Sequence, residues 1–455
     1  MKITVLGGGG VRSMFLAKSI AQKAKRLGID ELCFMDNDEE KLRIYGGMAA
    51  HVARLLCPEM RFSLTADPVE AAQDADYVIT TIRVGQDEMR AKDERIALDH
   101  GVLGQETTGA AGLSFAMRSV PALAAYCELI KKYAKPSVKV FNFTNPAGVV
   151  SQTLRDMGYD FTYGICDAPS GMLRSFALLY GANPANITGE VYGLNHLSYF
   201  KSITINGKEI LHDLIENDDA YKNSDMRYFS KELLRDRGAV LNEYLYYFYY
   251  REQAVANILK APQTRGEQIL DINRQMTAQL RQMDIENDFE GCLAVFNKWY
   301  GMREGSYMAS ETGEKRSQPW HFNIYEEEDD GGYAGVALKF IENAQSGQTG
   351  PMILCVPNGN AIDGLRPDDV VEVTCEVGPK GCAPHRIGAV DEQNLELIRR
   401  VKNYERLASK AIREKSRAAA VQALTLHPLV NSYSLACALT DTYIAHNKDY
   451  CDGWH

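Results

Sequence analysis

Two short motifs near the middle of the chain contain residue types that bind transition metals. Cys166 is followed by Asp167, and His196 is preceded by Asn195. A thiolate and an imidazole are ligands that a transition-metal ion prefers. Taken singly, each is more simply explained as a buried thiol or a hydrogen-bonded core histidine. The metal hypothesis therefore depends on what surrounds them in the chain.

The N-terminus has the pattern of a dinucleotide-binding turn. An apolar run at 2–6 predicts a buried strand, four glycines follow at 7–10, and the segment 13–25 has a helical pattern. Glycines permit a tight turn and let backbone N–H groups approach a pyrophosphate, which the positive end of the helix would face. Arg12 or Ser13 stands where the usual fingerprint has its third glycine.

A second predicted strand, 31–35, ends at Asp36. A carboxylate at this position can accept hydrogen bonds from the adenosine ribose and disfavours a 2′-phosphate. The order strand, glycines, helix, strand and acid predicts NAD binding more strongly than the glycines alone, which could form only a turn.

Composition narrows the function classes. The chain has 455 residues, with 50 Lys and Arg against 60 Asp and Glu, a net charge of −10. This balance argues against nucleic acid or an anionic membrane as a partner. We expect no signal peptide, because Lys2 leads directly into the first strand, and no apolar run long enough to span a membrane. The ten cysteines have no framework spacing, so we expect reduced thiols in a cytoplasmic protein.

The order of apolar and helical segments predicts an α/β fold with a Rossmann-like parallel sheet, 1–185, and an interwoven C-terminal α+β domain, 186–455. Further strands are expected at 77–82, 138–142, 161–165, 187–192 and 200–205. We expect a long helical region at 227–300, β-rich segments around 336–376, and two helices in 390–447 separated near His427.

Several motifs along the chain are similar to those of glycoside hydrolase family 4, the NAD- and metal-dependent glycosidases that do not use the two-carboxylate mechanism. The resemblance implies a fold similar to lactate and malate dehydrogenases. The chain departs from the family at Gln86, where a second glycine is frequent, and near Arg303. The matching motifs are Ile82-Arg83-Val84-Gly85, Lys92 to Ile96, Gly104 to Gly109, Asn142 to Pro146, the Cys166 and His196 motifs, Val370 to Val373, and His427 to Val430.

The resemblance implies oxidation of the sugar at C3 by NAD, proton removal at C2, elimination of the C1 oxygen, addition of water and return of the hydride. Cys166 and His196 would hold a divalent ion, usually Mn²⁺, that polarises the C3 oxygen. Asp167 would protonate the leaving oxygen, although it could instead be a partner of a metal ligand or a helix N-cap. An Asp here resembles the α-linked 6-phosphoglucosidase branch.

The resemblance also implies the remaining site residues. Tyr244, within an aromatic run, would be the base at C2, with Tyr246 and Tyr247 as alternatives. NAD would be bound by Gly8, Gly9, Gly10, Val11, Asp36, Arg83 and Asn142. The substrate would be bound by Arg95, Asn145, Asn195 and Arg265, although Asn145 could merely cap a helix and the arginines could be solvated.

The expected activity is hydrolysis of 6-phospho-α-glucosides by a homodimer or homotetramer. A β-linked or unphosphorylated glycoside is an alternative substrate. A hydroxy-acid dehydrogenase is a further alternative, but that class uses a His base without a metal and would leave Cys166 without a role. A non-catalytic NAD sensor would need neither Tyr244 nor the metal pair.

Overall fold

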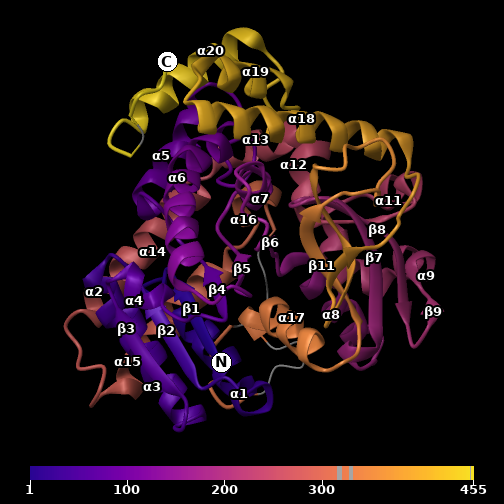
Figure 1. The fold of residues 1–455 in the computed structure, drawn as a ribbon. Helices are drawn as coiled ribbons and strands as arrows, with labels where there is room; N and C mark the ends of the chain where they lie inside the picture. Colours follow the sequence, from indigo (N-terminus) through magenta and orange to yellow (C-terminus); the bar gives the residue numbers. More distant parts are fainter. Residues whose placement is uncertain (315–319, 327–331, 451) are drawn as a thin grey trace. The chain divides into compact units, whose positions relative to one another are not determined.

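The computed structural model describes residues 1–314, 320–326, 332–450 and 452–455. The chain forms two compact units, each built from segments distant in sequence (Figure 1). The first contains 1–146, 252–334 and 441–454, and the second contains 147–251, 335–440 and residue 455. Each unit is thus assembled from separate stretches of the chain.

The first unit contains a parallel sheet in the order β5-β4-β1-β2-β3. Leu6 at the end of β1 pairs with Met35 of β2 on one side and with Thr80 of β4 on the other. This arrangement confirms the Rossmann-like fold. The strands are β1 (Lys2–Leu6), β2 (Glu31–Met35), β3 (Arg61–Thr65), β4 (Tyr77–Thr80) and β5 (Lys139–Asn142).

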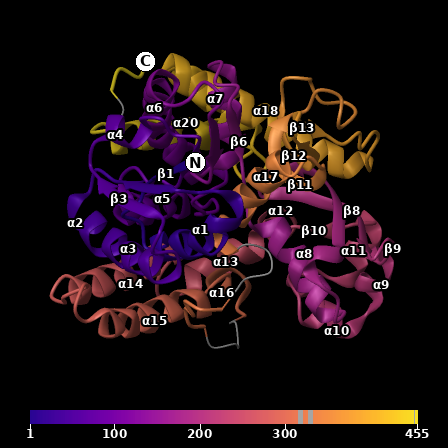
Figure 2. The same cartoon turned by 60° about the horizontal axis from the view of Figure 1, so that its bottom comes forward.

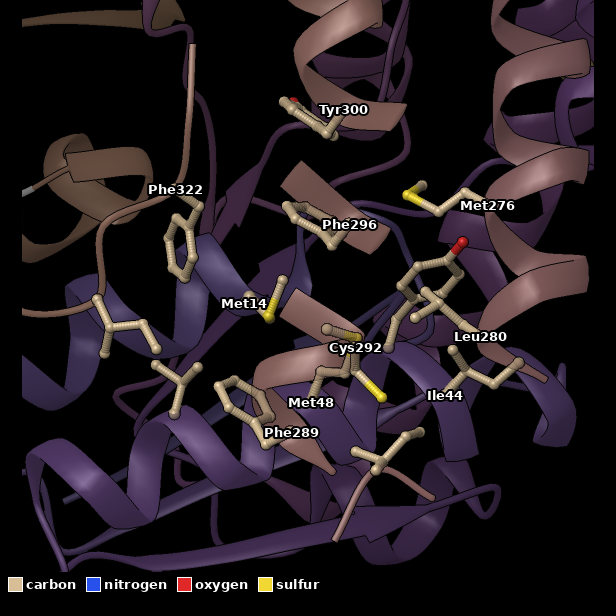
Figure 3. Packing of buried hydrophobic residues seen from close by; sticks show 14 residues of the cluster. Met14, Ile44, Met48, Met276, Leu280, Phe289, Cys292, Phe296, Tyr300 and Phe322 are labelled. Carbon is tan, nitrogen blue, oxygen red and sulfur yellow. The ribbon is translucent and has the colours of Figure 1, made fainter. Parts of the chain in front are cut away.

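Helices from distant parts of the chain share the core of the first unit (Figure 3). Met14 of α1 (Ser13–Leu27) and Met48 of α3 (Gly47–Leu56) belong to the same buried cluster as Met276 of α14 (Arg265–Leu280) and Phe296 of α15 (Phe289–Gly305). Phe15 packs edge-on against Phe296 with ring centroids 5.8 Å apart. Figure 2 shows α14 and α15 side by side.

The first unit also contains two long helices, α5 (Gln86–Asp99) and α6 (Gly109–Tyr133). By length and composition alone, α6 is long and apolar enough to cross a membrane. Its most apolar window is 61% buried within the protein, which is typical of a core helix. Buried Arg118 of α6 forms an ion pair of 2.6 Å with Asp93 of α5, and its Nε donates to the carbonyl of Val84.

The second unit is built on antiparallel strands. β6 (Thr162–Gly164) pairs with β11 (Gly350–Pro357), which pairs with β12 (Val370–Gly378) and then β13 (Gly381–Pro384). The expected β-rich region at 336–376 is therefore wrong at its start, which is the helix α17 (Gly335–Gln345). A second sheet contains β7 (Ile187–Leu194), β8 (Leu197–Ile205), β9 (Lys208–Glu209) and β10 (Val240–Leu241).

Two helical predictions need correction. The tail contains three helices rather than two, α18 (Glu392–Glu414), α19 (Arg417–Leu426) and α20 (Tyr433–His446). The missed break lies at Lys415, which has a φ of +52°, and at Ser416, whose hydroxyl caps α19. The region 227–300 is also not one helical stretch but is divided by β10 and short elements such as η4 (Glu243–Leu245) and α12 (Tyr246–Tyr249).

Candidate active site

The glycine turn after β1 is closely packed against the ends of β2 and β4. The N–H groups of Gly7 and Gly8 both donate to the carbonyl of Met35 at 2.9 Å. A Cβ on Gly8 would lie 2.6 Å from Cβ of Phe34, so no side chain fits there. Gly10 is exposed and Val11 is partly exposed. This cradle at the carboxyl end of a central parallel strand has the form that binds a pyrophosphate.

Asp36 lies beside this turn as predicted. Its Oδ2 accepts the N–H of Gly9 at 2.9 Å and its Oδ1 accepts the N–H of Asp38 at 3.0 Å. Burial raises the pKa of Asp36, and these two N–H groups oppose the rise. Asn142, at the end of β5, is buried, and its Oδ1 accepts the hydroxyl of Thr80 at 2.8 Å. Its amide therefore stabilises the ends of the strands.

Arg83 belongs to a group of buried charges in the first unit. Its guanidinium pairs with Glu106 at 2.5 Å, and Arg90 pairs with both Glu106, at 3.0 Å, and Glu94, at 2.9 Å. Burial raises the pKa of Glu106, but Arg83 and Arg90 outweigh it and lower the pKa to about 2. Glu94 in turn accepts the N–H of Gly266 at the start of α14, at 2.7 Å.

Arg265 lies among other cations in this group. It donates to the carbonyl of Arg303 at 2.8 Å and to the hydroxyl of Ser306 at 2.5 Å. Burial, followed by the charges of Arg90 and Arg303, lowers the pKa of Arg265 to about 10. Nε of Arg303 is buried without a hydrogen-bond partner in the described part of the chain. Guanidinium groups gathered in a partly buried place can bind an anionic ligand through charge-assisted hydrogen bonds.

Two predicted substrate residues are placed differently. Arg95 forms a bidentate pair with Glu267, with 2.8 and 2.7 Å to the two oxygens, and Glu267 also caps α14 through the N–H of Thr264. The structure thus gives Arg95 a helix-bracing contact. The carbonyl of Asn145 accepts the hydroxyl of Ser119 at 3.3 Å.

A two-residue hairpin loop in the second unit presents Asn195 and His196. Leu194 of β7 pairs with Leu197 of β8, so only these two residues make the turn. His196 has a φ of +61°, in the left-handed region that most residues avoid. Gly193 is required beside it, because a Cβ there would lie 2.3 Å from the carbonyl of Leu197. The backbone thus fixes the position of the candidate ligand histidine.

Cys166 lies just after β6, in a pocket of acidic and sulfur groups. Burial raises the pKa of its thiol well above the usual value, and the charges of Glu372 and Asp167 raise it further. Glu372 on β12 pairs in register with Cys355 of β11, which pairs with Gly164 of β6. Gly164, Cys355 and Glu372 thus form one row across three strands, and Cys166 follows Gly164 by two residues.

Glu372 holds the hairpin tip to this row. Its Oε1 accepts the amide of Asn195 at 3.1 Å and a weaker bond from the thiol of Cys355 at 3.8 Å. Burial raises the pKa of Glu372 to about 7, against the opposing effect of hydrogen bonds from Asn195, Ser198 and Cys355. In the described part of the chain, Oε2 of Glu372 is buried without a hydrogen-bond partner.

Tyr244 stacks directly on His196. The ring centroids lie 3.8 Å apart and the planes differ by 8°. Asn242 positions Tyr244 by accepting its backbone N–H at 3.0 Å. Tyr246 and Tyr247 are buried, whereas Tyr244 is partly exposed. Among the three tyrosines, Tyr244 is therefore the one placed against a candidate metal ligand.

Asp167 occupies the N-cap position of α8 (Ala168–Leu179), but its side chain makes no capping hydrogen bond. The helix-cap interpretation is therefore not supported by the contacts. The side chain is exposed, beside the buried Cys166. An exposed carboxyl that is not used by the helix is available to a ligand.

The donor set suits a divalent ion that takes only part of its coordination from the protein. Within the described ranges, no group of three or more His, Cys, Asp or Glu side chains is arranged to hold a metal. A thiol, an imidazole and a nearby buried carboxyl nevertheless match an ion whose other ligands are water and substrate oxygens. Nine cysteines are free thiols in the structure, and Cys451 lies outside the described residues.

The sequence reasoning assigned no role to Glu372, Glu106 or Arg303. Glu372 had a recognisable signal, since a lone acid within the apolar run 370–373 of a buried strand requires a partner. Glu106 lies in a motif whose similarity to the family does not by itself indicate a buried ion pair. Arg303 had no signal in the sequence, because its burial follows from the packing of α15.

Models of one protein family match nearly the whole chain. Residues 2–180 match the family 4 glycosyl hydrolase model, and residues 191–430 match the model of the family 4 glycosyl hydrolase C-terminal domain. A 6-phospho-beta-glucosidase of Escherichia coli K12 is 28% identical over 463 residues, covering 98% of this chain and 96% of the relative.

Two solved structures are similar over their full length. The Thermotoga maritima 6-phospho-beta glucosidase, solved with manganese, NAD⁺ and glucose-6-phosphate, has a TM-score of 0.81 and 25% identity and covers 99% of each chain. A 6-phospho-alpha-glucosidase from gut microorganisms, in complex with NAD and glucose-6-phosphate, has a TM-score of 0.82 and 25% identity, covering 100% of this chain and 99% of that one. The chain belongs to family 4 of the glycoside hydrolases.

Proposed function

We propose that this glycoside hydrolase cleaves 6-phospho-α-glucosides with NAD and a divalent ion such as Mn²⁺. The observation that carries the proposal is the stack of Tyr244 on His196, which brings a phenol to a candidate metal ligand. The glycine cradle and Asp36 suit NAD, and the thiol, imidazole and buried carboxyl suit the ion. Both cofactors are present in the similar solved structures.

When bound, NAD supplies a hydride acceptor for oxidation at C3, and the ion supplies a Lewis acid. Tyr244 accepts the proton from C2, since its side chain is partly exposed and its ring stacks on His196. Asp167 protonates the leaving oxygen at C1. Asn195 turns its amide nitrogen towards Glu372, so its carbonyl oxygen is left to accept a sugar hydroxyl.

The phosphate of the substrate is assigned to the arginine group. The side chains of Arg265 and Arg303 are partly buried, and the charges of Arg90 and Arg303 help lower the pKa of Arg265, so a phosphate dianion here would be attracted to these guanidinium groups. Asn145 and Arg95 remain proposed substrate contacts, although Arg95 must then leave Glu267 or bind through it. We also propose that residues 1–185 form the NAD-binding part, which contributes Cys166 and Asp167 as well, and that 186–455 form the catalytic, substrate-binding and oligomerisation part of a cytoplasmic homodimer or homotetramer.

The anomer is proposed on Asp167 alone, since relatives of both kinds resemble the chain. The second candidate is therefore a 6-phospho-β-glucoside, favoured by the name of the E. coli relative. The deciding test is a panel of p-nitrophenyl glucosides, α and β, with and without 6-phosphate, in NAD and Mn²⁺. We expect turnover of the phosphorylated α compound. Turnover of only the β compound would transfer the activity to the second candidate.

The redox route is tested in the same assays. In D₂O the sugar product should carry deuterium at C2, because the C2–H bond is broken in each turnover, and NADH should not accumulate. If the abstracted proton is shielded from solvent, no deuterium enters the product. In that case a substrate deuterated at C2 should still be turned over more slowly than the ordinary substrate. NADH formed in proportion to product would instead identify a dehydrogenase.

A further inference from the structure

Gln86 is the first residue of α5 and has a left-handed backbone, with a φ of +55°. The residue before it, Gly85, also has a positive φ, of +82°. Side chains other than glycine rarely adopt this conformation, and a glycine is frequent at position 86 in the family that the chain resembles. A glutamine here needs a compensating interaction of its side chain.

That interaction connects two loops. Nε2 of Gln86 donates to Oδ2 of Asp38 at 3.0 Å, and its Oε1 accepts a hydrogen bond from Nζ of Lys41. Lys41 lies 3.9 Å from the same Asp38 oxygen, so the three side chains close a ring of contacts. Asp38 and Lys41 follow β2, whereas Gln86 follows β4.

The bridge joins the connections that follow β2 and β4, at the carboxyl end of the parallel sheet. β1 lies between β2 and β4, and its glycine turn emerges at the same edge. Neighbouring strands are about 4.8 Å apart, so β2 and β4, whose connections the bridge joins, are roughly 10 Å apart. In open parallel sheets, ligands bind in the crevice at this edge, where connections on either side diverge.

We propose that Gln86, Asp38 and Lys41 form a clasp that retains NAD in its crevice. This inference rests on the proposed function, in which the hydride returns to the sugar and NAD need not leave between turnovers. A clasp that slows NAD exchange is compatible with such an enzyme, whereas an ordinary dehydrogenase must exchange its nucleotide in every cycle. The left-handed backbone of Gln86 is unfavourable in free energy, and the side-chain contacts of the clasp offset it.

The test is the dissociation rate of NAD from the full-length protein without sugar substrate, followed by stopped-flow displacement of a fluorescent NAD analogue. Gln86→Gly removes the clasp and relieves the backbone, and Lys41→Met removes one arm. Each should accelerate dissociation roughly 3- to 10-fold, the effect expected from losing one or two exposed hydrogen bonds. The double variant should be little faster than Gln86→Gly, because both act on one interaction.

The matched control is Asp74→Gly, another exposed residue of positive φ, at 56°, on the opposite edge of the sheet before β4. It should alter thermal stability as Gln86→Gly does but leave NAD dissociation unchanged. Unchanged dissociation in Gln86→Gly, or a change in association alone, would overturn the clasp. Because no sugar is present, this outcome is separate from failure of the glycosidase assay, and tight NAD binding without glycosidase activity would contradict only the proposed function.

Discussion

Tyr244 and His196 present ring faces to each other, so the phenol oxygen can be removed without disturbing the stack. Tyr244→Phe should lower kcat by about 10² to 10⁴, the usual contribution of a general base, with NAD affinity almost unchanged. The measurement is steady-state hydrolysis together with an NAD titration.

Tyr246→Phe is the matched control, because that ring is buried and stacks on Tyr250 instead, with centroids 5.2 Å apart. An equal loss in both variants would show that the aromatic run acts through packing. A Tyr244→Phe enzyme with normal kcat would assign proton removal to another group.

The protonation of Glu372 makes the free energy of unfolding depend on pH. Its pKa is raised from 4.5 to about 7 by burial, so the folded protein holds a proton that the unfolded chain has lost. Metal-free protein should therefore lose stability as the pH rises from 4.5 to 7, by roughly 3 kcal/mol at most. Glu372→Gln should abolish this component in urea unfolding at pH 5 and pH 7.5. Parallel pH profiles for the two proteins would contradict the assignment.

The candidate ligands could be predicted from the sequence because their motifs are local. Cys166 and His196 are recognisable from neighbours one or two residues away. Glu372 could not be joined to Asn195 in advance, because 177 residues separate them and strand pairing alone brings them together. The contact of Arg95 with Glu267 could not be predicted for the same reason, since Glu267 lies 172 residues away.

At the scale of single elements, the turn after α19 depends on a neutral histidine. Nδ1 of buried His427 accepts the N–H of Leu429 at 3.1 Å, and its ring packs edge-on against Tyr404, with centroids 4.5 Å apart. Burial lowers the pKa of His427 from 6.5 to about 3. Below pH 6.5, His427 is therefore protonated in the unfolded chain and neutral in the folded protein. The free energy of unfolding falls as the pH is lowered through this range.

His427→Asn keeps an acceptor at this position and removes the titration. Between pH 7.5 and 5, the wild-type protein should lose about 2 kcal/mol more stability than the variant, 1.5 pH units at 1.36 kcal/mol each. Chemical unfolding at the two pH values measures the difference. Equal losses would mean that His427 is protonated in the native state.

Strands with continuous apolar runs were predicted accurately, whereas helix boundaries that depend on capping residues were not. The strands at 2–6 and 31–35 match β1 and β2 at every residue, because a buried parallel strand is apolar on both faces. β3 was missed because it lies at the edge of the sheet and four of its five residues are partly or fully exposed. The break between α18 and α19 depends on Lys415, a residue with no propensity for a left-handed backbone.

At the scale of the whole molecule, the proposed NAD residues and the proposed metal ligands belong to different compact units. Each ligand should therefore protect its own part of the chain. Hydrogen exchange by mass spectrometry should show NAD slowing exchange in peptides from 1–146, and Mn²⁺ slowing exchange around Cys166 and His196 in 147–251. Cys166→Ser should remove only the second effect. Protection of 147–251 by Mn²⁺ in that variant would place the ion elsewhere.

The hairpin of Asn195 and His196 also bears on how this protein can diverge. Successive residues of a strand face opposite sides, and the loop between Leu194 and Leu197 contains no spare residue. One inserted or deleted residue would turn an entire strand over and remove His196 from Tyr244. Descendants of this sequence can therefore exchange side chains such as Asp167 and acquire new substrates, whereas the length of this hairpin is inherited unaltered.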